Sequence, residues 1–353
     1  MTSIFDIVKS FFPPTPWAYS WQLGIFQWFP AATVLQWLVR YHPAGKFSLH
    51  NSVLNVNGRF AWCVMELVGP VQLLYILATF PAEFKIAELP FWNKVTAALY
   101  VIHYINRSIV NPLFVAPSIS PARIELFLFA CLFNWFNSAC ISGWIVGYDT
   151  QLAGYESNGA LSIDLLESPW KKAIPWVGLS LFAYGLINNI SAERTLWSLR
   201  REEALRRAAK KSDDTDKDVS EAGNQNIYHK VYVIPPPSGL FRWILYPHYA
   251  FEWLEWIGFA LVGISVYPAR SMGLFQEETL STPAITLAPW IRPFASLANR
   301  LQIPLPLPAL VFVLNDIFTM MPQARRGREW YSQKFGKDAV AGRSAAIPGV
   351  AFL

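Results

Sequence analysis

Seven apolar segments, each about as long as a lipid bilayer is thick, constrain the fold of this chain more than any other feature. A spanning helix needs about 20 mostly apolar residues, and such segments lie near residues 20–40, 60–80, 95–116, 124–148, 172–192, 245–268 and 304–322. Only 15% of the residues are charged, whereas a soluble domain carries about a quarter. The sequence therefore predicts the all-α fold class, an integral membrane bundle of about seven transmembrane helices that forms a single membrane domain over residues 1–353.

Two stretches between the predicted spans differ in composition from the rest. Residues 201–226 combine Glu–Arg pairs at helical spacing with a polar tract, which predicts a helical stub that leads into a charged cytosolic linker loop. Residues 269–303 contain an apolar stretch that prolines and arginines interrupt, so we expect a lumenal or interfacial insertion there and not a span. The seventh predicted span is short, and three prolines stand at its start.

Lysine and arginine are distributed unevenly between the loops. The loop after the first span carries Arg40, Lys46 and Arg59 and the C-terminal tail is also basic, whereas the loop 149–169 carries four acids and no Lys or Arg. With seven spans, the positive-inside rule places the C-terminus in the cytosol and the N-terminus in the lumen. The net charge of +5 follows from this asymmetry and does not indicate affinity for nucleic acid. No removable signal stands out, so we expect the first span to act as a signal-anchor.

The ionisable side chains of Glu66, His103, Glu252 and Glu255 each lie in a long apolar segment with few other charges. A carboxylate at bilayer depth costs several kcal/mol unless it is paired, hydrated or protonated, and such residues usually face the bundle interior at a pathway or reaction site. A carboxylate that only holds two helices together is the structural alternative for Glu66.

Further polar side chains stand near these acids at helical spacing. Trp62 and Glu66 are four residues apart and share one face of the second span. In the third span, His103, Tyr104 and Arg107 offer an imidazole, a phenol and a guanidinium within little more than one turn. Tyr104 considered alone also fits an ordinary amphipathic aromatic residue.

The fifth span ends in a polar stripe of Asn189, Glu193 and Arg200, at i, i+4 and i+11. A snorkelling basic end explains Arg200 but explains Asn189 poorly. Aromatic and basic residues around Tyr331 in the tail also fit a headgroup anchor.

The sixth span carries His248, Glu252 and Glu255 on one stripe. Two acids and an imidazole suggest a metal site, but zinc and di-iron centres need more ligands, so we predict none. The sequence has no dinucleotide-binding glycine fingerprint, phosphate-binding loop or nucleophile elbow. The residues alone therefore predict a polar cavity that opens to the cytosol, and they do not name a cofactor.

Five short motifs, in order within residues 58–350, resemble those of the membrane steroid 5α-reductases, the 3-oxo-5α-steroid 4-dehydrogenase family. They are RFAWCVME at 59–66, HYINR at 103–107, GLF at 239–241, EWLEWIG at 252–258 and WYSQKF at 330–335. The resemblance implies a seven-helix enzyme of the endoplasmic reticulum that passes a hydride from NADPH to the β-carbon of an α,β-unsaturated ketone.

The resemblance also implies roles for individual residues. Glu66 and Tyr104 would be catalytic and meet the carbonyl oxygen of the substrate, and we expect Trp62 and Arg107 to bind the substrate. The implied cofactor-binding residues are Asn189, Glu193, Arg200, Tyr232, His248, Glu252 and Tyr331.

The residue types suit this chemistry. Hydride addition moves negative charge onto the ketone oxygen, and donors aimed at that oxygen lower the barrier. A Tyr hydroxyl donates and a carboxylate does not, so Glu66 must either be protonated or orient Tyr104. Arg107 or Arg200 would suit cofactor phosphates as permanently charged planar donors.

The chain departs from the family pattern at several positions near these residues. The family usually has Gln at Met65, Asp at Glu193, Asn at His248 and Gly at Phe251, and a His is expected where Gly327 stands. The Glu66–Tyr104 pair is intact, but these departures affect the expected cofactor geometry and substrate. We therefore expect either a steroid or another flat polycyclic enone or isoprenoid.

Other functions stay open. One is a polyprenal or 2-enoyl thioester reductase. Another is a membrane methyltransferase of the isoprenylcysteine kind, which Pro247-His248-Tyr249 suggests but which does not explain Glu66 with Tyr104. A proton-binding transporter is a third, and the lack of a visible inverted repeat argues against it. As partners we expect a hydrophobic small-molecule substrate and the lipid bilayer, no nucleic acid and no obligate protein.

Overall fold

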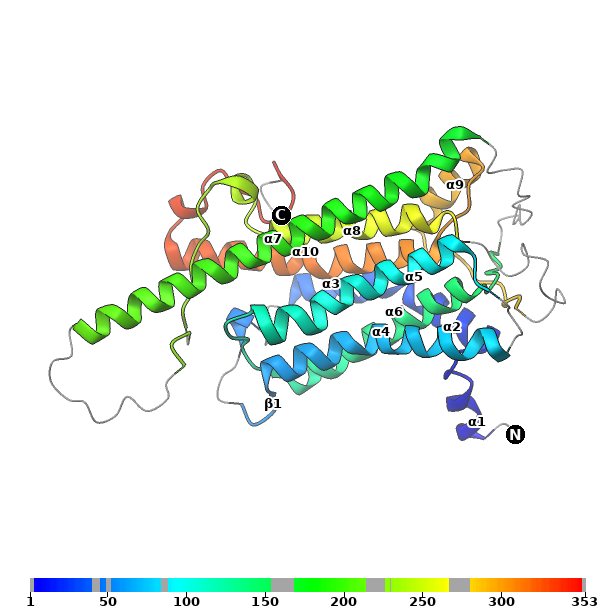
Figure 1. The fold of residues 1–353 in the computed structure, drawn as a ribbon, viewed down its shortest axis with the longest axis horizontal. Coiled ribbons are helices and arrows are strands. Elements are labelled where there is room, and N and C mark those ends of the chain that lie inside the picture. The colour runs from blue at the N-terminus through cyan, green and yellow to red at the C-terminus, as the bar shows by residue number, and fades with distance from the viewer. Residues whose placement is uncertain are drawn as a thin grey trace.

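The chain folds into a bundle of helices that run alongside one another (Figure 1). The computed structural model describes residues 3–39, 45–48, 52–83, 88–153, 168–213, 226–228, 230–266 and 280–350. Within these residues the only strands are the short antiparallel pair β1 (Asn55–Val56) and β2 (Ala122–Arg123). The prediction of an all-α membrane bundle is thereby confirmed.

Four described helices are long and apolar enough to cross a membrane. They are α4 (Gly58–Glu83), α6 (Ile124–Val146), α7 (Pro169–Asp213) and α10 (Leu307–Phe335). They match the second, fourth, fifth and seventh predicted spans. The seventh is longer than we predicted because α10 continues through Pro322 to Phe335. Pro308 lies in its first turn, where a proline needs no hydrogen-bond partner.

The other three predicted spans correspond to broken or shorter helices. The first is divided into α2 (Pro16–Phe26) and α3 (Phe29–Leu38), with Pro30 in the first turn of α3. The third combines α5 (Phe91–Tyr104) with the π-helical segment η2 (Ile105–Val115), and the sixth is α8 (Pro247–Gly263). These elements lie along the same axis as the four long helices (Figure 1), but the count of seven stays a prediction.

The two compositionally distinct stretches are partly described. The helical stub predicted after the fifth span continues α7 to Asp213, and residues 214–225 lie outside the described part. Residues 280–291 run along the bundle end and lead into α9 (Arg292–Leu301), a short amphipathic helix with exposed Phe294 and Leu297. The short helix α1 (Ile4–Lys9) and three 3-10 turns complete the described elements, namely η1 (Gly45–Phe47), η4 (Gly239–Phe241) and η6 (Asp338–Val340).

The loops that carry the basic residues meet at one end of the bundle. Strands β1 and β2 join the loops before α4 and α6. Arg59 binds the last carbonyls of η2 and the loop after it, with Nη2 2.8 Å from the oxygen of Ala116. Arg343 of the tail donates to the oxygen of Pro235 at 2.7 Å. The long α7 projects beyond the other helices at this same end (Figure 1).

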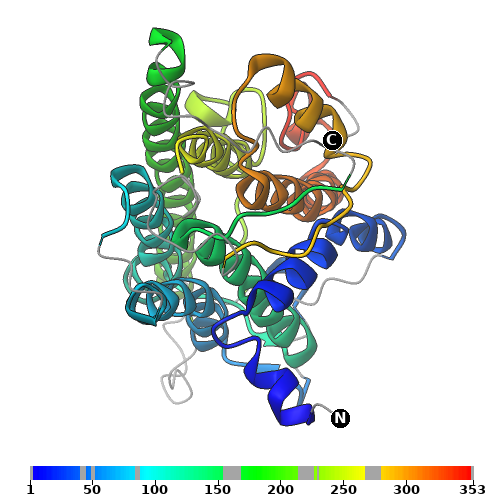
Figure 2. The same ribbon diagram turned by 90° about the vertical axis from the view of Figure 1, so that its right-hand side faces the viewer.

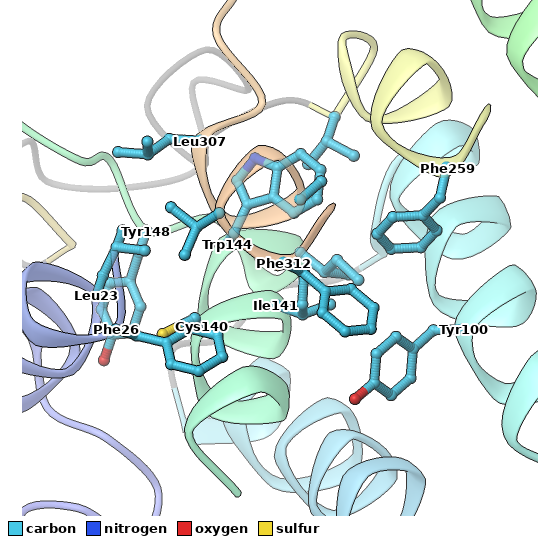
Figure 3. Packing of buried hydrophobic residues seen from close by; sticks show 14 of the residues in the cluster. Leu23, Phe26, Tyr100, Cys140, Ile141, Trp144, Tyr148, Phe259, Leu307 and Phe312 are labelled. Atoms are coloured by element: carbon cyan, nitrogen blue, oxygen red, sulfur yellow. The ribbon is translucent and has the colours of Figure 1, made fainter. Parts of the chain in front are cut away.

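An apolar core fills the centre of the bundle and fixes the rotation of the helices. Viewed along the axis, α6 and α10 lie towards the middle of the bundle (Figure 2). Leu23 and Phe26 of α2, Ile141 and Trp144 of α6 and Phe312 of α10 pack there (Figure 3). Burial of such side chains is worth about 1.5–3 kcal/mol each in water, and in lipid close packing between the helices takes over that role.

Glycines bring α7 and α8 into close contact. A Cβ on Gly185 of α7 would lie 2.5 Å from the backbone nitrogen of Glu255 and 2.7 Å from the oxygen of Phe251. A Cβ on Gly258 of α8 would lie 2.7 Å from the oxygen of Gly178. Small residues of this kind let two membrane helices approach backbone to backbone, and here they place the acids of α8 beside Asn189 of α7.

We expect Gly185→Ala to lower the free energy of unfolding by about 1–3 kcal/mol, because the new methyl group meets backbone that cannot move aside. The matched control is Gly24→Ala, whose methyl group would lie 3.7 Å from the side chain of Ile285, an ordinary contact. Thermal unfolding of the full chain in detergent measures both. Equal midpoints for the two variants would contradict the close packing of α7 and α8.

Candidate active site

Arg107 of η2 lies at the centre of a cluster of charged side chains inside the bundle. Its Nη1 is 3.1 Å from Oε1 of Glu193 on α7 and 3.8 Å from Oε2 of Glu252 on α8. Its Nε is 3.6 Å from Oε1 of Glu66 on α4, and its guanidinium lies 5.0 Å from the ring of Trp62. We call these five residues the Arg107 cluster. One permanent cation thus joins four helical elements.

The π-helical geometry of η2 supports this cluster. Asn111, four residues after Arg107, donates from Nδ2 to Oε2 of Glu193 at 3.0 Å. Trp197 of α7 donates in turn to Oδ1 of Asn111 at 3.0 Å. Both oxygens of Glu193 are therefore held by η2, and π-helical segments are frequent at functional sites. The sequence reading did not include Asn111 or Trp197.

Glu66 and Tyr104 meet through a third residue, Asn134 of α6. The Tyr104 hydroxyl donates to Oδ1 of Asn134 at 3.0 Å. The Nδ2 of Asn134 donates to the oxygen of Met65 at 2.8 Å and lies 3.5 Å from Oε2 of Glu66. Sequence reasoning missed Asn134, although a polar residue in an apolar span was the signal that identified Glu66. The departure at Met65 concerns only its side chain, because the contact uses its backbone oxygen.

The buried imidazole of His103 connects two acids of α8. Its Nδ1 lies 2.7 Å from Oε1 of Glu255, and its Nε2 lies 3.9 Å from Oε1 of Glu252. Asn189 of α7 lies 3.5 Å from Oε2 of Glu252. These contacts place His103, Glu252 and Asn189 directly beside the Arg107 cluster.

A second group of side chains surrounds Lys46 at the end of the bundle where the loops meet. Its Nζ lies 5.0 Å from the ring centroids of Tyr246 and Trp330 and 4.5 Å from that of Tyr331, and it contacts the Tyr246 hydroxyl. We call Lys46, Tyr246, Trp330 and Tyr331 the Lys46 cluster. Among the described residues no carboxylate lies within ion-pair distance of Lys46. Burial lowers the pKa of Lys46 to about 7.

The remaining cofactor residues that the resemblance implied lie in different places. Tyr232 packs edge-on against Trp330 at 4.9 Å and so borders the Lys46 cluster. His248 lies between Tyr246 and Tyr249, with ring centroids 5.7 and 4.6 Å away. Arg200 donates to the backbone oxygens of Ser118 and Tyr228, both at 3.0 Å, and is separate from both clusters. The predicted residues therefore follow a path from the Arg107 cluster to the loop end and do not form one compact site.

Several polar atoms along this path have no hydrogen-bond partner within the described part of the chain. They are Nε1 of Trp62, Oδ1 of Asn189, Nε of Arg200 and Nδ1 of His248. Buried polar atoms are normally satisfied, and each exception needs an explanation. A bound group with amide and phosphate functions would supply donors to Asn189 and acceptors to Arg200, so these residues fit a dinucleotide.

The structure shows the surroundings of two residues, Gly327 and Phe251, at which the chain departs from the family pattern. A Cβ on Gly327 would lie 2.8 Å from Nζ of Lys46, so the Lys46 cluster already fills the space where a His side chain would go. Phe251 packs edge-on against Tyr184 of α7 at 5.8 Å, on a side of α8 different from that of Glu252. In the described residues no group of three or more His, Cys, Asp or Glu is arranged to hold a metal ion.

Comparison with known proteins finds similarity to steroid reductases. A family model described as 3-oxo-5-alpha-steroid 4-dehydrogenase matches residues 218–293, which include α8 and its two acids. The 3-oxo-5-alpha-steroid 4-dehydrogenase 1 of Rattus norvegicus is 25% identical over 87% of this chain and 86% of its own length. The steroid 5-alpha-reductase DET2 of Arabidopsis thaliana is 25% identical over 92% of this chain and 93% of its own. An uncharacterized protein of Schizosaccharomyces pombe is 26% identical over 87% of this chain and 90% of its own.

The similarity to these relatives extends over most of the chain and includes every helix that contributes to the Arg107 cluster. The family model covers the segment that carries His248 and Glu252. Over most of its length the chain is therefore similar to 3-oxo-5-alpha-steroid 4-dehydrogenases and steroid 5-alpha-reductases.

Proposed function

We propose that the chain reduces the carbon–carbon double bond of an α,β-unsaturated ketone in a steroid or another polycyclic isoprenoid lipid, with NADPH as the reductant. The observation that carries the proposal is the meeting of Glu66 and Tyr104 at Asn134, beside Arg107 and inside an apolar bundle. Two of the relatives named above are called 3-oxo-5-alpha-steroid 4-dehydrogenase 1 and steroid 5-alpha-reductase, which supports the same class of substrate.

The Glu66–Tyr104 pair holds the carbonyl oxygen in this proposal. When the β-carbon of the substrate accepts a hydride, negative charge develops on that oxygen, and a preorganised donor stabilises the charge most in a site without water. Tyr104 donates its hydroxyl proton to Asn134 in the structure, so its hydrogen bond passes to the substrate oxygen on binding. Glu66 supports the same oxygen, either as a neutral acid or by orienting Tyr104 through Asn134.

The path from the Arg107 cluster to the Lys46 cluster suits NADPH, which supplies the hydride when bound. Asn189, Glu193 and Glu252 would hold its amide-bearing end near the substrate, since they surround Arg107. His248, Tyr232 and Tyr331 would follow its length towards the loops, where Lys46 and Arg200 offer positive charge to phosphate groups. Trp62 and Arg107 stay at the junction between cofactor and substrate.

We also propose where in the cell the chain lies. We place the chain in the endoplasmic reticulum membrane with its C-terminus in the cytosol and its N-terminus in the lumen, because the basic loops gather at the end of the bundle that carries the Lys46 cluster. A water-soluble cofactor would then enter from the cytosol and an apolar substrate from the lipid. A 2-enoyl thioester or polyprenal reductase would use the same residues, so these substrates belong in the same assay.

We expect Glu66→Gln and Tyr104→Phe each to lower kcat for a 4-ene-3-keto steroid by about 100-fold or more, as loss of an oxyanion donor does. NADPH-dependent turnover of purified protein measures this, with the saturated ketone identified as product. Controls with the same chemical changes are Glu88→Gln and Tyr75→Phe, since Glu88 and Tyr75 are 77% and 46% exposed. Near-normal rates in both site variants would remove the pair from the reaction.

We expect the affinity for NADPH to fall as the pH rises above about 7, the pKa of Lys46 in the protein. Below this pH the ammonium is charged and attracts a phosphate group; above it the ligand-free protein loses the charge, so binding must take up a proton. The loss is up to about tenfold per pH unit.

Quenching of tryptophan fluorescence between pH 6 and 9 measures this affinity. Lys46→Gln should bind more weakly at pH 6 and lose the steep dependence. The control is Lys94→Gln, since Lys94 is an exposed residue paired with Glu88 at 2.6 Å. If the affinity for NADPH depends on pH equally in the wild type and in Lys46→Gln, Lys46 does not take part in cofactor binding.

A further inference from the structure

Asp316 of α10 is a fifth acid beside the Arg107 cluster, and neither the sequence motifs nor the proposed function uses it. Its position follows from the contact among three aromatic rings one helical turn away. The ring of Phe312 on α10 lies 4.5 Å from that of Trp256 on α8 and 6.5 Å from that of Tyr100 on α5. Phe312 and Asp316 are four residues apart, so they share one face of α10.

The same turn leads to the reaction site on the neighbouring helices. α5 and α10 run in one direction and α8 in the other (Figure 1). One turn, about 6 Å, from the three rings towards the loop end therefore reaches Tyr104 on α5, Glu252 on α8 and Asp316 on α10. Asp316 is close enough to Tyr104 to interact with it electrostatically. It interacts in the same way with Arg107, Glu66 and Glu252, as this placement requires.

The rotation of α10 is fixed at this point. Asn315, the residue before Asp316, donates from Nδ2 to the backbone oxygen of Phe26 at 3.0 Å. Successive residues of a helix point about 100° apart, so Asn315 faces α2 and Asp316 is held towards α5 and α8. The buried Oδ2 of Asp316 has no hydrogen-bond partner in the described residues. Asn189 is only 4% exposed, and its Oδ1, beside Glu252, also has no hydrogen-bond partner in the described residues. Two separate buried oxygens can therefore form hydrogen bonds with a bound molecule here.

Asp316 is also the acid with the least compensation by positive charge. Arg107 lies within ion-pair distance of Glu66, Glu193 and Glu252, and His103 lies within that distance of Glu252 and Glu255. No cation of the described chain lies within that distance of Asp316. With five carboxyl groups beside one guanidinium and one imidazole, an uncompensated acid at this depth retains its proton.

We propose that Asp316 is the catalytic acid that protonates the α-carbon of the substrate, an inference that rests on the proposed function. As the β-carbon accepts the hydride, the electrons of the double bond move towards the carbonyl oxygen, which Tyr104 and Glu66 hold as an enolate. The enolate then re-forms its carbonyl group, and its α-carbon takes the proton from the Asp316 carboxyl, leaving a carboxylate. Water from the loop end returns this proton before the next turnover. NADPH is oxidised, the enone is reduced, and one hydride and one proton are added in total.

The location of Asp316 suits this role. The α-carbon is bonded to the carbonyl carbon, so a group level with Tyr104 but on another helix can reach it while Tyr104 holds the oxygen. General acid catalysis of this kind contributes about 10²–10⁴-fold to a rate. A residue that only bound a polar group of the substrate would affect KM instead of kcat.

The test compares Asp316→Asn with the wild type in full-length protein, using NADPH and a 4-ene-3-keto steroid. We expect kcat to fall about 100-fold while KM and the dissociation constant of NADPH stay within about threefold. The solvent deuterium isotope effect on kcat should rise, because proton delivery from water becomes the slow step. Asp316→Glu, which retains a carboxyl group, should recover at least about a tenth of kcat. Asp338→Asn is the control, since Asp338 is exposed in the tail.

The outcomes are separable. An Asp316→Asn variant with kcat within threefold of wild type, or with a raised KM and an unchanged kcat, overturns the assignment. If Asp316→Asn loses thermal stability or NADPH binding, the test relies on Asp316→Glu instead. An Asp316→Glu variant that is folded and binds NADPH but has no turnover contradicts the inference. If Asp316→Asn is active while Tyr104→Phe is not, only the role of Asp316 fails. If the wild type does not bind NADPH, the proposed function fails and this inference fails with it.

Discussion

The ion pairs of Arg107 are the interaction on which the rest of the site depends. One guanidinium faces carboxylates from α4, α7 and α8, at distances from 3.1 to 3.8 Å. None of these charges would be stable alone at bilayer depth, because an unpaired buried ion costs far more than a pair. Since each partner stands on a different helix, the same contacts that compensate the charges also fix how these helices are rotated. Removal of one partner would therefore leave another charge uncompensated and loosen the site.

The packing of the helices makes these contacts possible. Gly185 and Gly258 let α7 and α8 approach backbone to backbone, which brings Asn189 to Glu252. Asn134 performs a similar function on the other side of the site, where it connects α6 to Met65 and Glu66 of α4 and to Tyr104 of α5. The site is thus assembled from short contacts between neighbouring helices, while the Lys46 cluster at the bundle end joins the first loop to the tail.

Much of this arrangement follows from periodicity in the sequence. The apolar segments predicted the helices, and intramembrane acids at helical spacing predicted Glu66, Glu252 and their neighbours, because a charge in an apolar segment is costly enough to be informative. The break between α2 and α3, the length of α10 and the π-helical form of η2 were not predicted, since they depend on prolines and on packing against other elements. Lys46 was missed because its partner Tyr246 lies far away along the chain and no spacing rule connects them. Asn134 and Asp316 were missed although both are polar residues inside predicted spans, because no charged residue at helical spacing drew attention to them.

We propose that the Glu66–Tyr104 pair binds a ketone oxygen beside a dinucleotide in the interior of the bundle. A density map of the chain with NADPH and a 4-ene-3-keto steroid is the decisive measurement. We expect the ketone oxygen within hydrogen-bonding distance of the Tyr104 hydroxyl and the Glu66 carboxyl, with the cofactor extending from Arg107 towards Lys46. A steroid bound elsewhere, with Tyr104 still bonded to Asn134, or a cofactor that avoids the Arg107 cluster, would contradict it.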